Sequence, residues 1–287
     1  MKIVLQIFIF IVFAAFTSCN IINPAEKIPT YITIDSVTVL PTISATHGSV
    51  SHKITDVWAY YNFQLLGAFE LPAKIPIFAD GKGQLQLVAG IWDNGLSGTR
   101  AKYPFFQVDT FTFNANPTGT IHYMPAFKYR TADTPKINYY VEDFEQGNGF
   151  VALNGDTTLV KTSAANEVFE GNWSAKLELN TANPTGESIT SQEYMPPPNR
   201  DCYIELNYKS DVNFDIRTQV YHIGTTVLTD VMSLKAKDKW TKVYIRFSGF
   251  TSSFQYGKFK FIIKAALPEG ATSANLLIDN FKIIYYN

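Results

Sequence analysis

The sequence predicts an all-β protein made of two sandwich-like modules. Alternation of apolar and polar residues with a period of two outweighs helical spacing in almost every window of the chain. Charged residues make up 17 % of the chain and aromatic residues 15 %, a balance typical of β proteins with aromatic-lined faces. A polar, proline-bearing linker at 131–137 divides a first module at 31–130 from a second at 138–287.

The first nineteen residues indicate export. Lys2 precedes an apolar run at 3–16, which is shorter than the roughly 20 residues that a bilayer span needs. The run closes on Thr-Ser-Cys, and a cysteine in this place resembles the lipobox of bacterial lipoproteins, with the looser Ser-Cys ending of Bacteroidetes-type members. This resemblance implies a signal peptide at 1–18, a membrane anchor of acyl chains on Cys19 and a tether at 19–30. The alternative is an ordinary cleaved signal with a cysteine nearby by chance.

The same resemblance implies an outer-membrane address, with the cell surface favoured over the periplasmic side. Bacteroidetes lipoproteins bound for the surface often carry acidic residues directly after the lipidated cysteine. Here the first acidic residue is Glu26, so both orientations stay open.

The first module is predicted to contain a strand at 31–40, then two strands within 54–71 joined by a tight turn near Tyr61 and Asn62. Pro72 and Pro76 bracket a short edge strand, since proline cannot donate to a ladder. The segment 81–83 is expected to be a turn and 84–91 a further strand. The run "LLGAFELPAKIPIF" followed by "DGKG" resembles PEGA-like and other immunoglobulin-type modules of bacterial surface proteins, which implies an Ig-like sandwich.

A turn-rich loop at 93–100 separates Trp92 from Tyr103. Because Tyr, Trp and Arg dominate binding hot spots, Trp92, Arg100 and Tyr103 are one candidate recognition patch. The favoured interpretation is that Tyr103 and Phe105 complete the core of the module while Arg100 is solvated.

The second module is predicted to consist of strands alone. They are expected near 157–162, 202–209, 214–222, 227–234, 239–247, 259–267 and 276–286. The motifs "EDFEQG", "EGNWSAKLEL", "DKWTKVYIRF" and "ANLLIDNFKI" resemble those of carbohydrate-binding modules and other galactose-binding-like domains. That resemblance implies a jelly-roll sandwich over 138–287 and suggests, more weakly, sugar binding.

The jelly-roll resemblance also implies a structural calcium ion, held between the first strand, a loop and the last strand. The positions that match are Asp143, Glu145, Asn172 through its carbonyl, and Asp279. Calcium takes six to eight such oxygen ligands. Alternatively, Asp279 caps a turn through its own backbone and Glu145 is simply exposed.

On each predicted strand of the second module, alternation separates side chains that face the core from side chains that project outward. The candidate ligand-binding residues in it are Arg217, Gln219, Tyr221, Tyr244 and Arg246. Flat rings and forked donors suit a sugar, but they equally suit a protein contact. In antiparallel sheets, outward residues of this kind most often form an ordinary solvated face. A solvated or protein-contacting face is therefore favoured over a sugar site as the interpretation of these residues.

Catalysis is not predicted. The four histidines have no metal-binding spacing and the chain has no nucleophile elbow or phosphate-binding glycine loop. Glu205 and Asp215 could lie on neighbouring strands of one face, as the carboxylates of a glycosidase must, but the nearby Arg217 and Lys209 favour charge balancing instead. Cys202 alternates in phase with apolar neighbours, so it is expected in a core. A formal net charge of −1 with no charge block makes nucleic acid an unsuitable partner.

These observations predict a non-catalytic outer-membrane lipoprotein that binds a glycan or another surface ligand through its jelly roll. The alternative function is a structural subunit that docks on an outer-membrane transport or assembly complex, through the same face or the 92–106 loop. A glycoside hydrolase is the third possibility.

Overall fold

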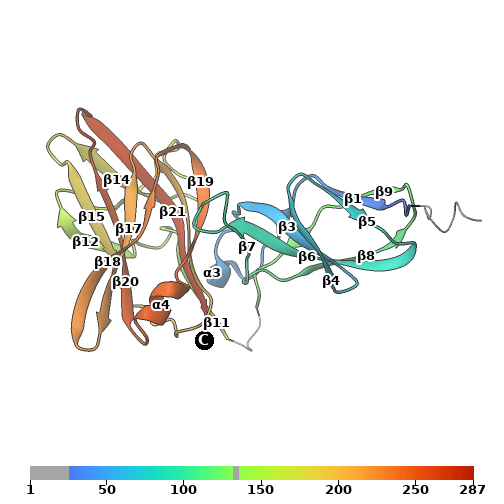
Figure 1. Cartoon of the computed structure of the whole chain (residues 1–287). Helices are drawn as coiled ribbons and strands as arrows, with labels where there is room; N and C mark the ends of the chain where they lie inside the picture. Colours follow the sequence, from blue (N-terminus) through green and yellow to red (C-terminus); the bar gives the residue numbers. More distant parts are fainter. Residues whose placement is uncertain (1–25, 132–135) are drawn as a thin grey trace, which may run out of the picture.

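The computed structural model describes residues 26–131 and 136–287, which form two β-sandwich modules side by side along the molecule (Figure 1). The predicted all-β class is confirmed. Cys19 and the predicted signal peptide lie outside the described residues. Within residues 26–131 and 136–287, no helix is both long and apolar enough to cross a bilayer.

The first module is built from three sheets. Their strand orders are β5-β1-β9, β10-β2 and β4-β3-β6-β7, with β8 paired to β6. A four-residue helix, α3, lies before β3 in a segment that the sequence marked only as a polar loop. The bounds are β1 Thr30–Ile34, β2 Thr38–Val39, α3 Ser44–His47, β3 Ile54–Tyr61, β4 Gln64–Glu70, β5 Ala73–Ile77, β6 Gly81–Trp92, β7 Arg100–Lys102, β8 Asp109–Ala115, β9 Thr120–His122 and β10 Ala126–Phe127.

Two local predictions for this module can be compared with the structure. The turn predicted between β3 and β4 is present, since Asn62 and Phe63 both have positive φ, as this tight turn requires. The turn predicted at Gly81–Gly83 is wrong, because this segment opens β6 and pairs with Phe113–Ala115 of β8. The ring of Tyr61 lies so close over Gly83 that a Cβ there would overlap it, so the glycine serves a close approach within the sheet.

The second module has two layers. One sheet has the order β13-β14-β21-β16-β19 with β11 paired to β21, and the other has the order β12-β15-β20-β17-β18. A short helix, α4, joins β19 to β20. The bounds are β11 Ile137–Glu142, β12 Phe150–Gly155, β13 Val160–Thr162, β14 Ser174–Asn180, β15 Thr185–Thr190, β16 Cys202–Ser210, β17 Phe214–His222, β18 Thr225–Leu234, β19 Lys237–Arg246, α4 Ser248–Ser253, β20 Lys258–Ala266 and β21 Ser273–Tyr286.

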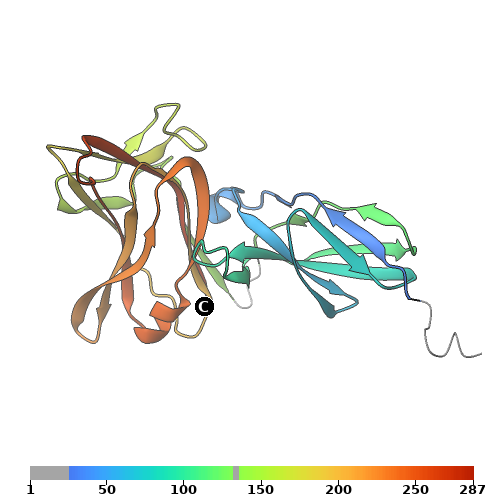
Figure 2. The same cartoon turned by 45° about the horizontal axis from the view of Figure 1, so that its top comes forward.

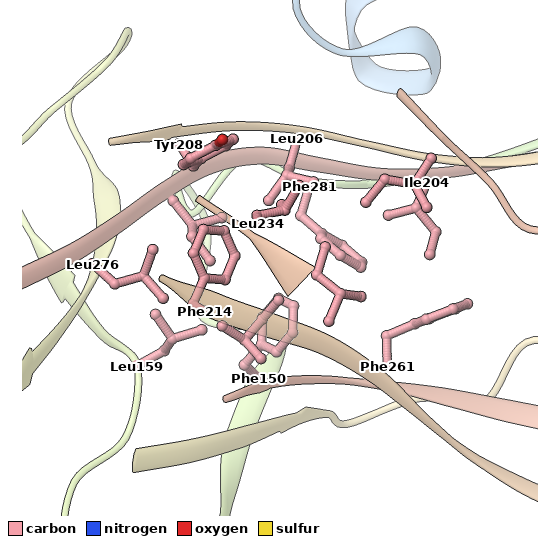
Figure 3. Packing of buried hydrophobic residues seen from close by; sticks show 14 of the residues in the cluster. Phe150, Leu159, Ile204, Leu206, Tyr208, Phe214, Leu234, Phe261, Leu276 and Phe281 are labelled. Carbon is pink, nitrogen blue, oxygen red and sulfur yellow. The ribbon is translucent and has the colours of Figure 1, made fainter. Parts of the chain in front are cut away.

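The core of the second module lies between its two sheets (Figure 3). Alternate residues of each strand point into it, such as Ile204 and Leu206 of β16 against Phe214 of β17 and Phe261 of β20. Cys202 is fully buried in this cluster, as predicted, and burial raises the pKa of its thiol. The predicted jelly-roll layering is therefore present, whereas the immunoglobulin-like class of the first module stays a prediction.

The two modules share buried surface. The first-module core cluster also contains Tyr203, Tyr244 and Ile284, which belong to strands of the second module. Tyr103 makes edge contacts with the ring of Tyr203, and its centroid lies 4.9 Å from that of Tyr244. The prediction that Tyr103 and Phe105 complete a core is confirmed, and the core they complete extends across both modules.

Candidate functional site

The module interface decides which broad face of the second sandwich is open. The sheet that contains β16, β19 and β21 turns its outer face toward the first module, while the β12-β15-β20-β17-β18 sheet lies on the far side (Figures 1 and 2). We call the outer face of this second sheet the open sheet face. It is the candidate functional site because its strands carry outward side chains that the first module does not cover.

Pairing places the outward residues of β17 in the middle of the open sheet face. Phe214, Ile216 and Val220 point into the core, so the alternate residues point outward. These outward residues are Asp215, Arg217, Gln219 and Tyr221, and each has a cross-strand neighbour on both β18 and β20.

Ion pairs fix the charged side chains of this face. Arg217 Nε lies 2.6 Å from Asp230 Oδ1 on β18, and Arg217 Nη1 lies 3.9 Å from Glu187 Oε1 on β15. Lys264 Nζ of β20 lies 2.9 Å from the same Glu187 oxygen. Four strands thus contribute to one charge network, which holds the Arg217 guanidinium in place. Ile262, the β20 neighbour of Arg217, is fully buried although it is not part of the core cluster, so these side chains cover the centre of the face.

The β17 row ends in an accessible aromatic ring. Tyr221 is 48 % exposed and pairs across the sheet with Lys258 of β20 and Thr226 of β18. Gln219 lies between Arg217 and Tyr221 on the same face, beside Lys260. The row therefore presents the guanidinium of Arg217, the amide of Gln219 and the ring of Tyr221 in this order along β17. All three lie on the outer side of the sheet, so a ligand can contact them without a change in the core.

The structure does not bring the five predicted ligand-binding residues together. Arg217, Gln219 and Tyr221 lie on the open sheet face, but Tyr244 and Arg246 lie on β19 of the opposite sheet. Tyr244 is 1 % exposed, and its hydroxyl accepts a hydrogen bond from the backbone N–H of Lys53 in the first module (3.2 Å).

Arg246 is bound to the first module as well, because its Nε lies 2.8 Å from Asp93 Oδ2. The assignment of Tyr244 and Arg246 to one ligand face with β17 is therefore corrected. Alternation tells on which side of a strand a residue projects, but it does not tell to which of two sheets the strand belongs.

The predicted calcium ligands are divided between separate hydrogen-bond networks. Glu145 Oε1 accepts the backbone N–H groups of Asn172 (2.7 Å) and Trp173 (3.0 Å). Asp143 Oδ1 accepts the N–H of Glu145 (3.1 Å).

Asp279 lies elsewhere, where its two carboxylate oxygens accept the Ser174 hydroxyl (2.6 Å) and the Asn280 N–H (2.7 Å). Burial raises the pKa of Asp279 to about 7. Within the described ranges, no three His, Cys, Asp or Glu side chains gather as a metal site. These residues, as placed, do not fit a shared calcium ion, and calcium binding stays a prediction from resemblance.

Glu205 and Asp215 do not form a glycosidase pair. Glu205 projects from β16 into the module interface, whereas Asp215 projects from β17 on the open sheet face, where it accepts the Ser233 hydroxyl. The two carboxylates therefore lie on opposite outer faces of the sandwich. The sequence-based placement on one face is corrected for the same reason as that of Tyr244.

Glu205 is instead the centre of a buried charge cluster between the modules. Its carboxylate accepts hydrogen bonds from the hydroxyls of Tyr103 and Tyr129 of the first module. Lys242 Nζ lies 2.8 Å and Lys282 Nζ 3.6 Å from Glu205 Oε2. Burial acts to raise the pKa of Glu205, but the attraction of the two ammonium groups outweighs it and holds the pKa at about 2.

Sequence reasoning missed two groups of residues that shape these surfaces. Glu187 was missed because 185–190 was not recognised as a strand; its alternation is hidden by small and polar residues facing the core. The 92–106 loop, which the alternative function offers as one of two docking surfaces, contacts β19 of the same chain through Asn94. The N–H of Asn94 donates to the Tyr244 carbonyl (2.9 Å), and its side chain accepts the Arg246 N–H (2.9 Å).

Comparisons with known proteins give structural neighbours only. No family model and no curated protein matches the chain. Among solved structures, a xylan-binding domain from carbohydrate-binding module family 22 is similar at 16 % identity, covering 51 % of this chain and 92 % of its own, with a TM-score of 0.35. A family 11 module from Clostridium thermocellum is similar at 12 % identity over 50 % of this chain and 94 % of its own, with a TM-score of 0.37.

A third neighbour spans more of the chain. It comes from a study of carbohydrate-binding modules of the β-sandwich superfamily, and it covers 90 % of this chain and 98 % of its own at 11 % identity and a TM-score of 0.38.

Proposed function

We propose that the protein is a non-catalytic, lipid-anchored outer-membrane protein whose second module binds a glycan on the open sheet face. The observation that supports this most directly is the β17 row, in which Tyr221 is exposed and Arg217 and Gln219 are half-buried. On the opposite sheet, the first module covers the corresponding part of β16 and β19 around Tyr203 and Tyr244. Aromatic rings can stack on the C–H face of a sugar, and the amide and guanidinium can pair with its hydroxyls.

The charge network supports the proposal through its rigidity. Arg217 is already held by Asp230 and Glu187, so little side-chain entropy remains to be lost when a ligand arrives. The charges on this face also balance locally, since Lys264 and Arg217 surround Glu187. A face of this kind suits a neutral, hydroxylated ligand better than a strongly charged one.

A glycan array with residues 20–287, the mature protein without its lipid-bearing Cys19, tests the proposal. We expect at least one polysaccharide to bind, and we expect Tyr221→Ala to weaken it by about tenfold or more, which corresponds to about 1.4 kcal/mol. The matched control is Phe63→Ala, which removes an exposed ring in the first module (76 % exposed) and should leave binding unchanged. Equal loss in both variants, or no binding to any glycan, contradicts the proposed role.

The proposed address rests on the amino-terminal pattern and needs its own test. Mass spectrometry of the protein from its native host should find acyl chains on Cys19 and no residues before it. An unmodified Cys19 or a retained leader contradicts lipid anchoring, and surface proteolysis of intact cells then separates the outward from the periplasmic orientation.

The alternative role as a structural subunit of an outer-membrane complex makes a different prediction. Asn94 of the 92–106 loop contacts β19 of the same chain, whereas residues 95–99 are exposed. Such a partner would therefore dock on the open sheet face or on this exposed segment. Affinity capture of a stable membrane partner that is lost in Tyr221→Ala, with no glycan signal, would favour this alternative.

A further inference from the structure

A second candidate site lies at the edge of the second module, away from the open sheet face. A hollow of about 250 Å³ opens where the edge strand β11 meets the start of β12 and the segment after β15. We call it the edge pocket. Its lining combines aromatic, amide, hydroxyl and carboxylate side chains with backbone, and the residues that matter here are Tyr140, Glu142, Gly149, Ser191, Gln192 and Tyr194.

The carboxylate of Glu142 is held in the wall of the edge pocket by two backbone donors. Its Oε1 accepts the N–H of Phe144 (2.7 Å) and its Oε2 accepts the N–H of Gly149 (2.6 Å). A Cβ at position 149 would overlap Oε2, so the glycine is what permits this close approach. Each carboxylate oxygen keeps further lone-pair capacity, which a ligand hydroxyl can use.

The aromatic side of the pocket is also fixed in place. The rings of Tyr140 and Tyr194 meet edge to face with centroids 5.1 Å apart, and Tyr140 stacks on Tyr285 behind it at 6.0 Å. The backbone of Tyr194 exchanges two hydrogen bonds of 2.8 Å with Phe259 of β20. Neither wall has to rearrange to accept a ligand, which lowers the entropy cost of binding.

Size and charge narrow the ligand class. A volume of about 250 Å³ corresponds to about eight water molecules and falls below the range of about 300–1,000 Å³ typical for drug-sized ligands. A hollow of this size suits one ring-sized molecule. The Glu142 carboxylate repels anions, while two backbone N–H groups already stabilise its charge without a ligand cation.

We propose that the edge pocket binds a single neutral sugar ring, either a free monosaccharide or the end of a glycan chain. Glu142 accepts its hydroxyl hydrogens, Gln192 and Ser191 line the mouth, and the Tyr140–Tyr194 pair contacts its apolar face. This inference takes its ligand class from the proposed glycan binding but uses residues that the open sheet face does not contain.

Protein-detected NMR with monosaccharides tests the edge pocket. The probes are glucose, galactose, mannose, xylose and N-acetylglucosamine at millimolar concentration, with choline and glucuronate as the charged comparisons. We expect at least one neutral sugar to shift the amide signals of Gly149 and Gln192. Ser191→Phe, which places a ring at the exposed mouth, should abolish the shifts. The matched control Ser163→Phe makes the same change at an exposed serine outside the edge pocket and should retain them.

Three other results would contradict sugar binding in the edge pocket. Absence of shifts from all five sugars, shifts that persist in Ser191→Phe, or shifts from choline or glucuronate alone would overturn the assignment. Glu142→Gln provides a second variant. It should weaken the affinity for the same sugar about tenfold, while the other amide signals remain those of the folded protein. Polysaccharide binding that is lost in Tyr221→Ala and kept in Ser191→Phe shows the open sheet face to be independent, so either site can fail without the other.

Discussion

Replacement of Glu205 by glutamine should destabilise the whole protein, because the modules share this carboxylate. Glutamine keeps one acceptor for the hydroxyls of Tyr103 and Tyr129 but removes the counter-ion of Lys242 and Lys282. Burial already lowers the pKa of Lys282 to about 7, so the loss of Glu205 also favours the neutral form of this lysine. Breaking a buried ion pair by removing one partner costs about 3–5 kcal/mol. Independently, the pKa of Glu205 falls from 4.5 to about 2 on folding, and at about 1.36 kcal/mol for each pKa unit this is about 3 kcal/mol.

The assay is thermal and urea-induced unfolding of residues 20–287. A loss of about 3 kcal/mol should lower Tm by about 6–12 °C in a protein of this size. The matched control is Glu193→Gln, since Glu193 is half exposed and pairs with Lys258 at 3.6 Å on the surface. That change should cost less than about 0.5 kcal/mol.

The same cluster should make the stability of the protein depend on pH. The folded pKa of Glu205 lies below its unfolded value, so its stabilising contribution is fully present above about pH 5 and is lost as the pH falls toward 2. The stability difference between wild type and Glu205→Gln should therefore shrink over that interval. A loss under about 1 kcal/mol at neutral pH, or a difference that does not change with pH, would refute this account of the interface.

Three further predictions concern single buried positions. Burial raises the pKa of Asp279 to about 7, so between about pH 4 and 7 the folded protein keeps a proton on this carboxyl that the unfolded chain releases. The free energy of unfolding should therefore fall as the pH rises through this interval. In Asp279→Asn, the free energy of unfolding measured in urea should change less with pH over the same interval. In a Cys19→Ser background, the buried thiol of Cys202 should react with a thiol-specific colorimetric reagent only after denaturation, and fast labelling of the native protein would contradict its core position. Gly90→Ala should cost about 1–3 kcal/mol in thermal unfolding because its Cβ would overlap a buried carboxylate, whereas Gly98→Ala, with open space around it, should be neutral.

Much of the strand content could be predicted because the alternation is clean. The strand at 214–222 has the predicted bounds, and Cys202 lies in the core as its phase indicated. Strands were missed where small or polar residues face inward, as at Ser188 of β15, because the hydrophobic pattern then disappears. The strand predicted at 31–40 is split into β1 and β2, each of which pairs in parallel with a late strand of the module. Such long-range pairing leaves no local signal in the sequence.

The candidate site was predicted only in part for a related reason. The projecting residues of β17 were identified, but Tyr244 and Arg246 were grouped with them although their strand lies in the other sheet. The outward faces of β16 and β17 have a similar mixture of rings and charges, and nothing in either strand tells which one another module covers. That information lies in Tyr103 and Tyr129, more than seventy residues earlier, which only the folded chain brings to Glu205.

The same interface orients the molecule. Because Glu205, Tyr203 and Tyr244 join the modules through buried contacts, the first module cannot turn to another face of the sandwich without exposing a buried charge cluster. The described chain enters at the end of the first module that lies farthest from the second (Figure 1). Anchored through Cys19, the proposed lipoprotein would therefore use its first module as a rigid spacer. The open sheet face would then be held at the end of the molecule remote from the membrane, where a large glycan could reach it.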